Sequence, residues 1–179
     1  MNILTPDTGQ TADIAALYQR VFAASEGDAE GAGIGALAQR LMTTTPDGDL
    51  FAFAAEENAT LLGVILFTRL RYTQDPRSVF VLGPVAVATE HHRRGIGRRL
   101  ITDGLSGVQA AGVDVAVTYG DPGYYTRFGF TPITETQVPA PYPLQHPHGW
   151  LGQSLSEAPL TPLRGTCTCV PGFADPAFW

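Results

Sequence analysis

Residues 82–105 read LGPVAVATEHHRRGIGRRLITDGL and contain the most informative pattern in the chain. The apolar run Val79–Ala88 predicts a strand that is buried on both faces. A turn with Gly95 and Gly97 follows, and apolar residues then recur at helical spacing up to about Ala111. Unpaired N–H groups at a helix N-terminus attract anions, and glycine lets a bulky phosphate approach the backbone. The stretch therefore predicts a pyrophosphate site, to which four arginines add positive charge: Arg93, Arg94, Arg98 and Arg99.

Two details narrow the kind of ligand. A Rossmann fingerprint needs a third glycine where Leu100 stands, and it usually opens the first βα unit of a chain, whereas this motif lies mid-chain. Pro84 interrupts the strand directly after Gly83 and cannot donate a ladder hydrogen bond, which predicts a bulge where pairing breaks. The freed backbone groups suit an extended, amide-bearing ligand, and pantetheine attached to a pyrophosphate is one.

A second segment, GDPGYYTRFGF at Gly120–Phe130, completes a resemblance. Together with LGPVAV it resembles the GNAT (Gcn5-related) N-acetyltransferase family and, within it, the bacterial YhbS-like group. The family's acetyl-CoA signature, Gln/Arg-x-x-Gly-x-Gly/Ala, is matched by His92–Gly97, with His92 where Gln or Arg is usual. The resemblance covers roughly residues 1–133.

The resemblance implies a fold and a reaction. The fold is α/β, with a mixed central sheet splayed at its fourth and fifth strands and flanked by helices. We expect one domain over residues 1–179, with a core at 1–133 and a Pro-rich portion at 134–179 that completes the sheet. The implied reaction moves an acetyl group from acetyl-CoA, as co-substrate, to a primary amine by direct attack.

The resemblance also implies roles for residues. Tyr125 stands four residues before Gly129 and becomes the general acid that protonates the departing thiolate. A backbone N–H near Val85–Val87 would hold the thioester oxygen. The expected acetyl-CoA-binding residues are Val85, Ala86, Val87, His92, Arg93, Arg94, Gly95, Ile96, Gly97, Arg98 and Asp121.

The sequence leaves the general base and the acceptor open. Glu56, Glu57, His146 and His148 are candidate bases, and a water chain or an amine that arrives neutral would also serve. The acceptor is a small-molecule or peptide amine. Seven acids between Glu26 and Glu57 suggest either a soluble surface or a field that attracts a cationic amine. The alternatives are an idle acyl-CoA-binding or regulatory module of the same fold, and a protein N-terminal or lysine acetyltransferase.

Composition excludes several other classes. The chain has 179 residues, 44% of them hydrophobic and 16% charged, which suits one globular domain. The net charge of −6 argues against a nucleic-acid partner. All basic residues are arginine, so a Walker-A loop and a Schiff-base lysine are excluded.

We expect no metal site, and we expect Cys167 and Cys169 to be core side chains. The longest apolar run is too short to span a bilayer and we see no signal peptide, so we expect a cytoplasmic protein without a membrane partner. A homodimer is left open.

Periodicity predicts the element order β-α-α-β-β-β-α-β-α-β. Thr11 is the expected N-cap of a helix that contains Ile14–Phe22, and a second helix is expected around Ile34–Met42. Further expectations are a hairpin that turns at Glu57–Ala59, a strand at Val113–Val117, a short helix at Pro122–Phe128, and late strands around Trp150–Leu155 and Leu163–Val170.

Overall fold

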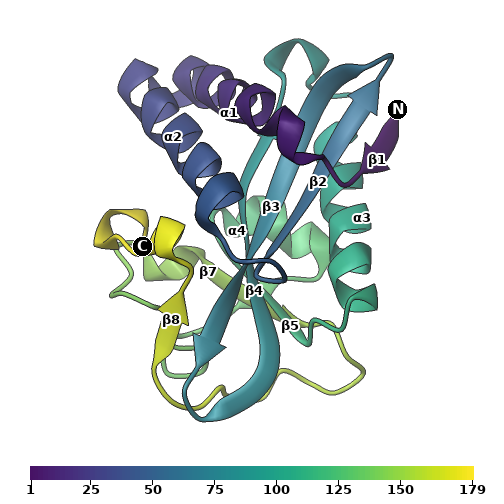
Figure 1. The fold of residues 1–179 in the computed structure, drawn as a ribbon. Coiled ribbons are helices and arrows are strands. Elements are labelled where there is room, and N and C mark those ends of the chain that lie inside the picture. The colour runs from purple at the N-terminus through teal and green to yellow at the C-terminus, as the bar shows by residue number, and fades with distance from the viewer. The chain divides into compact units, whose positions relative to one another are not determined.

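The computed structural model describes residues 1–179 and contains an eight-stranded sheet in the order β1-β2-β3-β4-β5-β7-β6, with β8 paired to β3 (Figure 1). The strands are β1 (Asn2–Leu4), β2 (Leu50–Glu57), β3 (Thr60–Tyr72), β4 (Asp75–Val87), β5 (Val115–Tyr119), β6 (Thr131–Pro132), β7 (Trp150–Ser154) and β8 (Cys167–Cys169). The helices are α1 (Thr11–Glu26), α2 (Asp28–Thr44), α3 (Ile96–Ala110) and α4 (Pro122–Tyr125). β4 and β5 pair in parallel, while β5 and β7 pair antiparallel. The predicted mixed sheet flanked by helices is confirmed.

The residues group into two compact units that are interleaved along the chain. The first comprises Met1–Leu66 and Pro84–Gly104, and the second Phe67–Gly83 and Leu105–Trp179. β3 and β4 contribute residues to both. The single domain expected over residues 1–179 stays a prediction.

Helices α1 and α2 run side by side in the first unit (Figure 1). Two glycines of α2 make this close approach possible. A Cβ at Gly31 would lie 2.6 Å from Ala23 Cβ, and one at Gly35 would lie 2.9 Å from Gln19 Cβ. Ile14, Leu17 and Tyr18 are fully or almost fully buried on α1, because they form the apolar stripe that its sequence predicts.

The first unit also contains the hairpin between β2 and β3. Asn58 and Ala59 have φ values of 52° and 59°, which is the backbone of a two-residue turn and confirms the predicted hairpin. On β3, Gly63 makes room for α3, because a Cβ there would lie 2.9 Å from Leu100 Cδ1 and 2.8 Å from the Ala86 carbonyl oxygen. The hairpin and α3 thus fix the end of β4 from which the predicted pyrophosphate site begins.

The second unit is organised around β5. Its register with β4 runs from Val79–Val115 to Leu82–Thr118, and β7 pairs with its other edge from Ser154 to Trp150. The Pro-rich portion supplies two strands: β7 beside β5, and β8 beside β3. Trp150 is fully buried and donates from Nε1 to the Val138 carbonyl at 2.8 Å.

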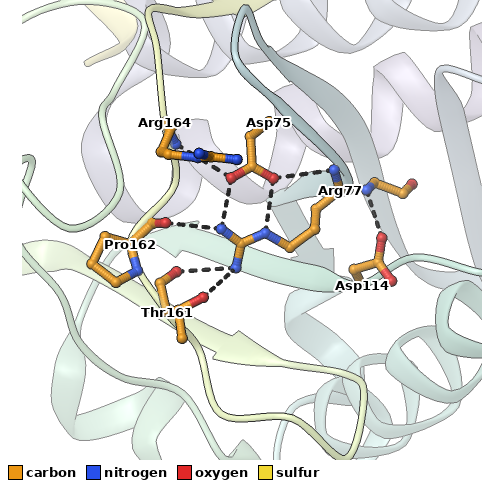
Figure 2. A network of polar contacts seen from close by, with 7 residues as sticks. Asp75, Arg77, Asp114, Thr161, Pro162 and Arg164 are labelled. Carbon is orange, nitrogen blue, oxygen red and sulfur yellow. Dashed lines mark hydrogen bonds and ion pairs between the residues drawn. The ribbon is translucent and has the colours of Figure 1, made fainter.

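Asp75 and Arg77 form an ion pair at the start of β4, and hydrogen bonds of the Arg77 guanidinium join it to the segment before β8, as Figure 2 shows. Arg77 donates to Asp75 Oδ1 from Nε at 2.8 Å and to Oδ2 from Nη2 at 2.7 Å. The same guanidinium donates to the carbonyls of Thr161 and Pro162 at 3.0 and 2.9 Å. The Arg77 guanidinium lowers the pKa of the Asp75 carboxyl to about 2. The cluster of Asp75, Arg77, Thr161 and Pro162 is called the Asp75 clamp below.

Several boundaries differ from those expected. Thr11 is the first residue of α1 and not its N-cap, because Asp7 instead caps a preceding 3₁₀ turn and accepts from the Gly9 N–H. α2 begins at Asp28, and its glycine- and alanine-rich first turns carry little apolar periodicity. The last strand shortens to Cys167–Cys169. No helix of the structure combines the length and apolar composition that crossing a bilayer requires.

Candidate active site

The turn before α3 exposes the backbone as the sequence predicts. Arg93 and Gly95 have φ values of 63° and 75°, so the chain passes twice through the left-handed region before the helix begins. The Arg99 N–H donates to the Gly95 carbonyl at 3.0 Å. The N–H groups of Ile96, Gly97 and Arg98 therefore have no acceptor within the helix and carry its partial positive charge. We call His92–Arg98 the α3 loop.

The arginines around the α3 loop divide into two pairs. Arg94 forms an ion pair with Glu57 at 2.9 Å and contacts His91 Nδ1 at 3.1 Å. Arg99 forms an i,i+4 ion pair with Asp103 at 3.3 Å. Arg93 and Arg98 are exposed and have no partner in the protein. These two guanidinium groups are the ones free to meet an anion.

His92, where the family usually has Gln or Arg, binds back to the sheet. Its Nε2 lies 2.9 Å from the Val87 carbonyl oxygen, and the protonated nitrogen donates to it. The Ala88 N–H donates to the Leu62 carbonyl at 2.8 Å. The end of β4 and the α3 loop are thus held together by a side chain that points to the backbone and not outward.

The last residues of β4 lie beyond its pairing with β5. Gly83 has a φ of 148°, and the register with β5 ends one residue earlier, at Leu82. Because Ala88 donates toward β3, strand alternation turns the N–H groups of Val85 and Val87 away from β3. The structure thus brings the backbone of Val85–Val87 and the α3 loop together in the first unit.

Tyr125 lies at the end of α4 in the second unit, with its ring against the end of β5. A Cβ at Gly120 would lie 2.7 Å from Tyr125 Cε2, so only glycine leaves room for the ring. Phe130 packs edge-on at 5.9 Å between ring centroids. Burial raises the pKa of Tyr125 to about 12, while a side-chain hydrogen bond with Thr118 acts in the opposite direction. The phenol therefore stays protonated.

The neighbouring Tyr124 has a different environment. The Arg127 guanidinium lies over its ring at 5.1 Å, and Phe128 packs at 5.5 Å. Asp121 caps α4, because its Oδ1 accepts from the Gly123 N–H at 2.9 Å. That hydrogen bond fixes the turn that carries both tyrosines.

The four candidate bases lie in three places. Glu57 is bound to Arg94, which lowers the pKa of the Glu57 carboxyl. Glu56 accepts from the Gln10 side chain and lines a polar pocket with Asp13 and Arg20. His146 and His148 line a separate pocket with the end of β5. No group of three His, Cys, Asp or Glu side chains gathers as a metal site.

The acids of Glu26–Glu57 do not form one cluster. Asp28 and Glu30 lie in the first turn of α2, whereas Asp47 and Asp49 follow its last residue, Thr44. A 17-residue helix is about 25 Å long, which exceeds the screening length of about 8 Å at physiological salt. A common attractive field over an acceptor is therefore not what this stretch provides.

The sequence analysis did not single out two buried hydroxyls. Tyr18 donates to the Pro84 carbonyl at 2.7 Å and so supports the backbone next to the bulge. Thr118 donates to the Leu82 carbonyl at 3.0 Å, at the last β4–β5 pair. Two features of the sequence could have indicated them. Tyr18 is a tyrosine within the apolar stripe of a helix, and Thr118 is the one hydroxyl-bearing residue in the apolar run Val115–Thr118.

Comparisons with known proteins agree with the fold and with both motifs. The model for the acetyltransferase (GNAT) domain matches residues 48–132, which include the α3 loop and Tyr125. The chain is 37% identical over 120 residues to the uncharacterized N-acetyltransferase YjhQ of Escherichia coli K12, and the match covers 64% of each protein. It is 29% identical to the E. coli protein YhbS over 77 residues, which are 43% of this chain and 46% of YhbS.

Solved structures extend the likeness over nearly the whole chain. The E. coli GNAT-family N-acetyltransferase YhbS, in complex with CoA, matches with a TM-score of 0.80 and 23% identity, over 97% of this chain and 92% of that one. A GNAT-family acetyltransferase from Brucella melitensis, in complex with acetyl-CoA, matches with a TM-score of 0.73 and 24% identity, over 96% and 97%. Residues 48–132 match the acetyltransferase (GNAT) domain, and the chain as a whole has the fold of the GNAT-family acetyltransferases.

Proposed function

We propose that this protein is an N-acetyltransferase that moves the acetyl group of acetyl-CoA to a primary amine by direct attack. The observation that carries the proposal is the co-occurrence, in one GNAT domain, of an open α3 loop and a protonated Tyr125 on α4. The CoA-bound and acetyl-CoA-bound relatives support the choice of co-substrate.

The residues around the α3 loop fit a pyrophosphate. The N–H groups of Ile96, Gly97 and Arg98 would donate to its oxygens, and Arg93 and Arg98 would neutralise its charge. Val85 and Val87 would pair with the amides of the pantetheine arm, as an added strand does. Acetyl-CoA supplies an activated thioester when bound.

Transfer makes three chemical demands on the protein. The amine must be unprotonated, the oxyanion must be stabilised, and the departing thiolate must receive a proton. A backbone N–H of Val85–Val87 would stabilise the oxyanion. Tyr125 would donate the proton, and its raised pKa keeps the phenol protonated at every physiological pH. The same shift makes the phenol a weaker acid.

The experiment is a thiol-release assay with acetyl-CoA and a panel of small amines, peptides and no acceptor, together with calorimetric titration of acetyl-CoA. We expect binding, and thiol release that depends on the small amine. Binding without release for any acceptor would favour the idle acyl-CoA-binding module, and release with peptides alone would favour a protein acetyltransferase. No binding of acetyl-CoA to the folded protein would refute the proposal.

A further inference from the structure

A pocket of about 380 Å³ lies at the carboxyl end of β5 in the second unit. One wall is the end of β5 and the turn into α4, formed by Tyr119, Gly120, Asp121 and Pro122. The other wall is the turn before β7, formed by His146, His148 and Gly149. The space lined by these seven residues is called the β5 pocket.

Hydrogen bonds hold the two walls in place. The Gly120 N–H donates to the Gly149 carbonyl at 2.9 Å, and the His146 N–H donates to the Tyr119 hydroxyl at 2.6 Å. A Cβ at Gly149 would lie 2.9 Å from the Gly120 carbonyl oxygen, so glycine is needed for the walls to approach this closely. The pocket is therefore formed by the backbone, and its two imidazoles are exposed side chains on a fixed turn.

The β5 pocket and the Tyr125 ring meet at Gly120. The Cα–Cβ direction of Gly120 points to the Tyr125 ring. Successive side chains of a strand point to opposite faces, so Tyr119 points the other way, where it packs at 6.3 Å against Trp150 and reaches His146. The pocket thus has one wall on the face opposite to the predicted proton donor. A nucleophile must approach a thioester carbonyl from a side that the departing sulfur and its proton donor leave open.

The chemistry of the lining favours an amine. Asp121 carries the one formal negative charge in the lining, and no arginine lies there to bind a phosphate. His146 and His148 lie 5.9 Å apart between ring centroids. Imidazole is the side chain that exchanges a proton near neutral pH. The other titratable side chains in the pocket lining are those of Asp121 and Tyr119.

We propose that the β5 pocket binds the acceptor, that Asp121 selects an amine with a second cationic group, and that the imidazole pair of His146 and His148 takes the proton of the reacting ammonium. This inference rests on the proposed acetyl transfer and names its acceptor class and its base. The amine nitrogen loses a proton to an imidazole and then forms a C–N bond to the thioester carbonyl. The C–S bond breaks, and the thiolate receives the Tyr125 proton. The second proton that the nitrogen loses as it becomes an amide returns through water to the Tyr125 phenolate.

The test uses two probe acceptors of equal chain length, putrescine and 4-aminobutyrate, which differ in the charge at the far end. Four proteins are compared: the wild type, the double variant His146→Gln/His148→Gln, Asp121→Asn, and the control Glu135→Gln. Glu135 is an exposed carboxylate of the segment that leads to the same turn, and it lies outside the pocket lining. Asparagine at position 121 keeps an oxygen to accept from the Gly123 N–H.

We expect the wild type and Glu135→Gln to prefer putrescine. The histidine double variant should lower kcat/KM for putrescine at least tenfold and change the acid limb of its pH profile, with the Kd of CoA unchanged within twofold. Asp121→Asn should reduce the preference for putrescine over 4-aminobutyrate by a similar factor. Unchanged kcat/KM in the double variant would overturn the proposal. A Kd of CoA that rises in parallel with the fall in kcat/KM would instead show that the pocket binds the co-substrate, and would overturn the proposal.

A binding measurement keeps the inference testable without turnover. Putrescine is titrated into the CoA complex while the imidazole resonances of the four histidines are followed by NMR, assigned with the single variants His146→Gln and His148→Gln. We expect shifts at His146 and His148 but not at His91. Absence of these shifts overturns the pocket assignment. Shifts without thiol release would refute acetyl transfer and leave the amine site standing.

Discussion

The α3 loop and the Tyr125 region serve the same proposed reaction and are built in opposite ways. The α3 loop presents main-chain N–H groups at an exposed turn, where His92 points back to the sheet, Arg94 pairs with an acid, and Arg93 and Arg98 stay exposed. The Tyr125 region places one phenol in an aromatic cluster against Gly120, next to the buried hydroxyl of Thr118. One region works through the backbone and the other through single side-chain atoms.

This difference predicts where each region is sensitive. A backbone site tolerates a change of side chain as long as the turn keeps its conformation, which explains how His92 can stand in a Gln/Arg position. A side-chain site tolerates the loss of neighbours but not the loss of the reacting atom. Substitutions should therefore separate binding of CoA from turnover, and the following variants test that separation.

The largest effect is expected at Gly97. Gly97→Glu places a carboxylate beside the N–H groups that would hold the pyrophosphate, so like charge and bulk oppose binding. We expect the affinity for CoA to fall by about 100-fold or more, equivalent to about 2.7 kcal/mol. Calorimetry measures it, with Gly33→Glu as control, because Gly33 is an exposed helical glycine with open space around its Cβ. A folded Gly97→Glu protein with unchanged affinity would break the backbone-site interpretation.

Tyr125→Phe should have nearly as large an effect, on a different parameter. The substitution keeps the ring against Gly120 and removes the proton donor, so kcat should fall roughly 100-fold with little change in the Kd of CoA. Tyr124→Phe is the matched control, since that ring is covered by Arg127 and Phe128. If both variants keep most of their turnover, the proton comes from water.

Thr118→Val should give an intermediate effect. Valine has the shape of threonine but has no hydroxyl to hydrogen-bond with Tyr125 or to donate to the Leu82 carbonyl. We expect kcat to fall about tenfold and stability to fall by about 1 kcal/mol, with KM unchanged. Thr118→Ser should restore kcat because it restores the hydroxyl. Equal kcat for all three proteins would show that Thr118 only joins the strands.

His92 should matter less, because it acts on the α3 loop through a single exposed hydrogen bond. His92→Ala removes the donor to the Val87 carbonyl, which predicts a CoA affinity a few-fold lower, in line with about 0.5–1.5 kcal/mol for one hydrogen bond. His92→Gln, the usual family residue, keeps a donor and should bind CoA at least as tightly as the wild type. A loss of more than 50-fold in His92→Ala would place the imidazole on the phosphates instead.

The α3 loop could be predicted from sequence better than the Tyr125 region, and for a physical reason. Gly83, Pro84, Gly95 and Gly97 act on the backbone locally, so the bulge and the open helix N-terminus follow from chain order alone. The family resemblance supplied Tyr125. Its partner Thr118 depends on how α4 folds back on β5, and no local pattern contains that contact.

The same distinction explains the less successful expectations. Thr11 precedes an apolar stripe, which predicts an N-cap there. In the structure a 3₁₀ turn precedes α1, and the Asp7 side chain accepts from the N–H groups of that turn. The sequence offers His146 and His148 as candidate bases but does not place them. Hydrogen bonds from the turn before β7 to Tyr119 and Gly120 place them at the end of β5. Long-range hydrogen bonds made the difference in each case.

The Asp75 clamp provides the smallest expected effect on acetyl transfer and so calibrates the others. Asp75→Asn removes the ion pair with Arg77, and the variant should keep its turnover and its affinity for CoA while it loses about 2 kcal/mol of stability at pH 7. The pKa of Asp75 is lower in the folded protein than in the unfolded chain, so the carboxylate stabilises the fold above about pH 4. That contribution is lost as pH falls from about 4 to about 2.

Urea unfolding at pH 7, 4.5 and 3 measures it, with Glu157→Gln, an exposed carboxylate without an ion pair, as control. The difference in stability between the wild type and Asp75→Asn should narrow at pH 3, where about half of it remains, because the folded-state pKa of about 2 lies below that pH. A variant that loses stability and turnover together would mean that lowered stability alone reduces catalysis, and the losses in Tyr125→Phe and Thr118→Val would then have to be corrected for it.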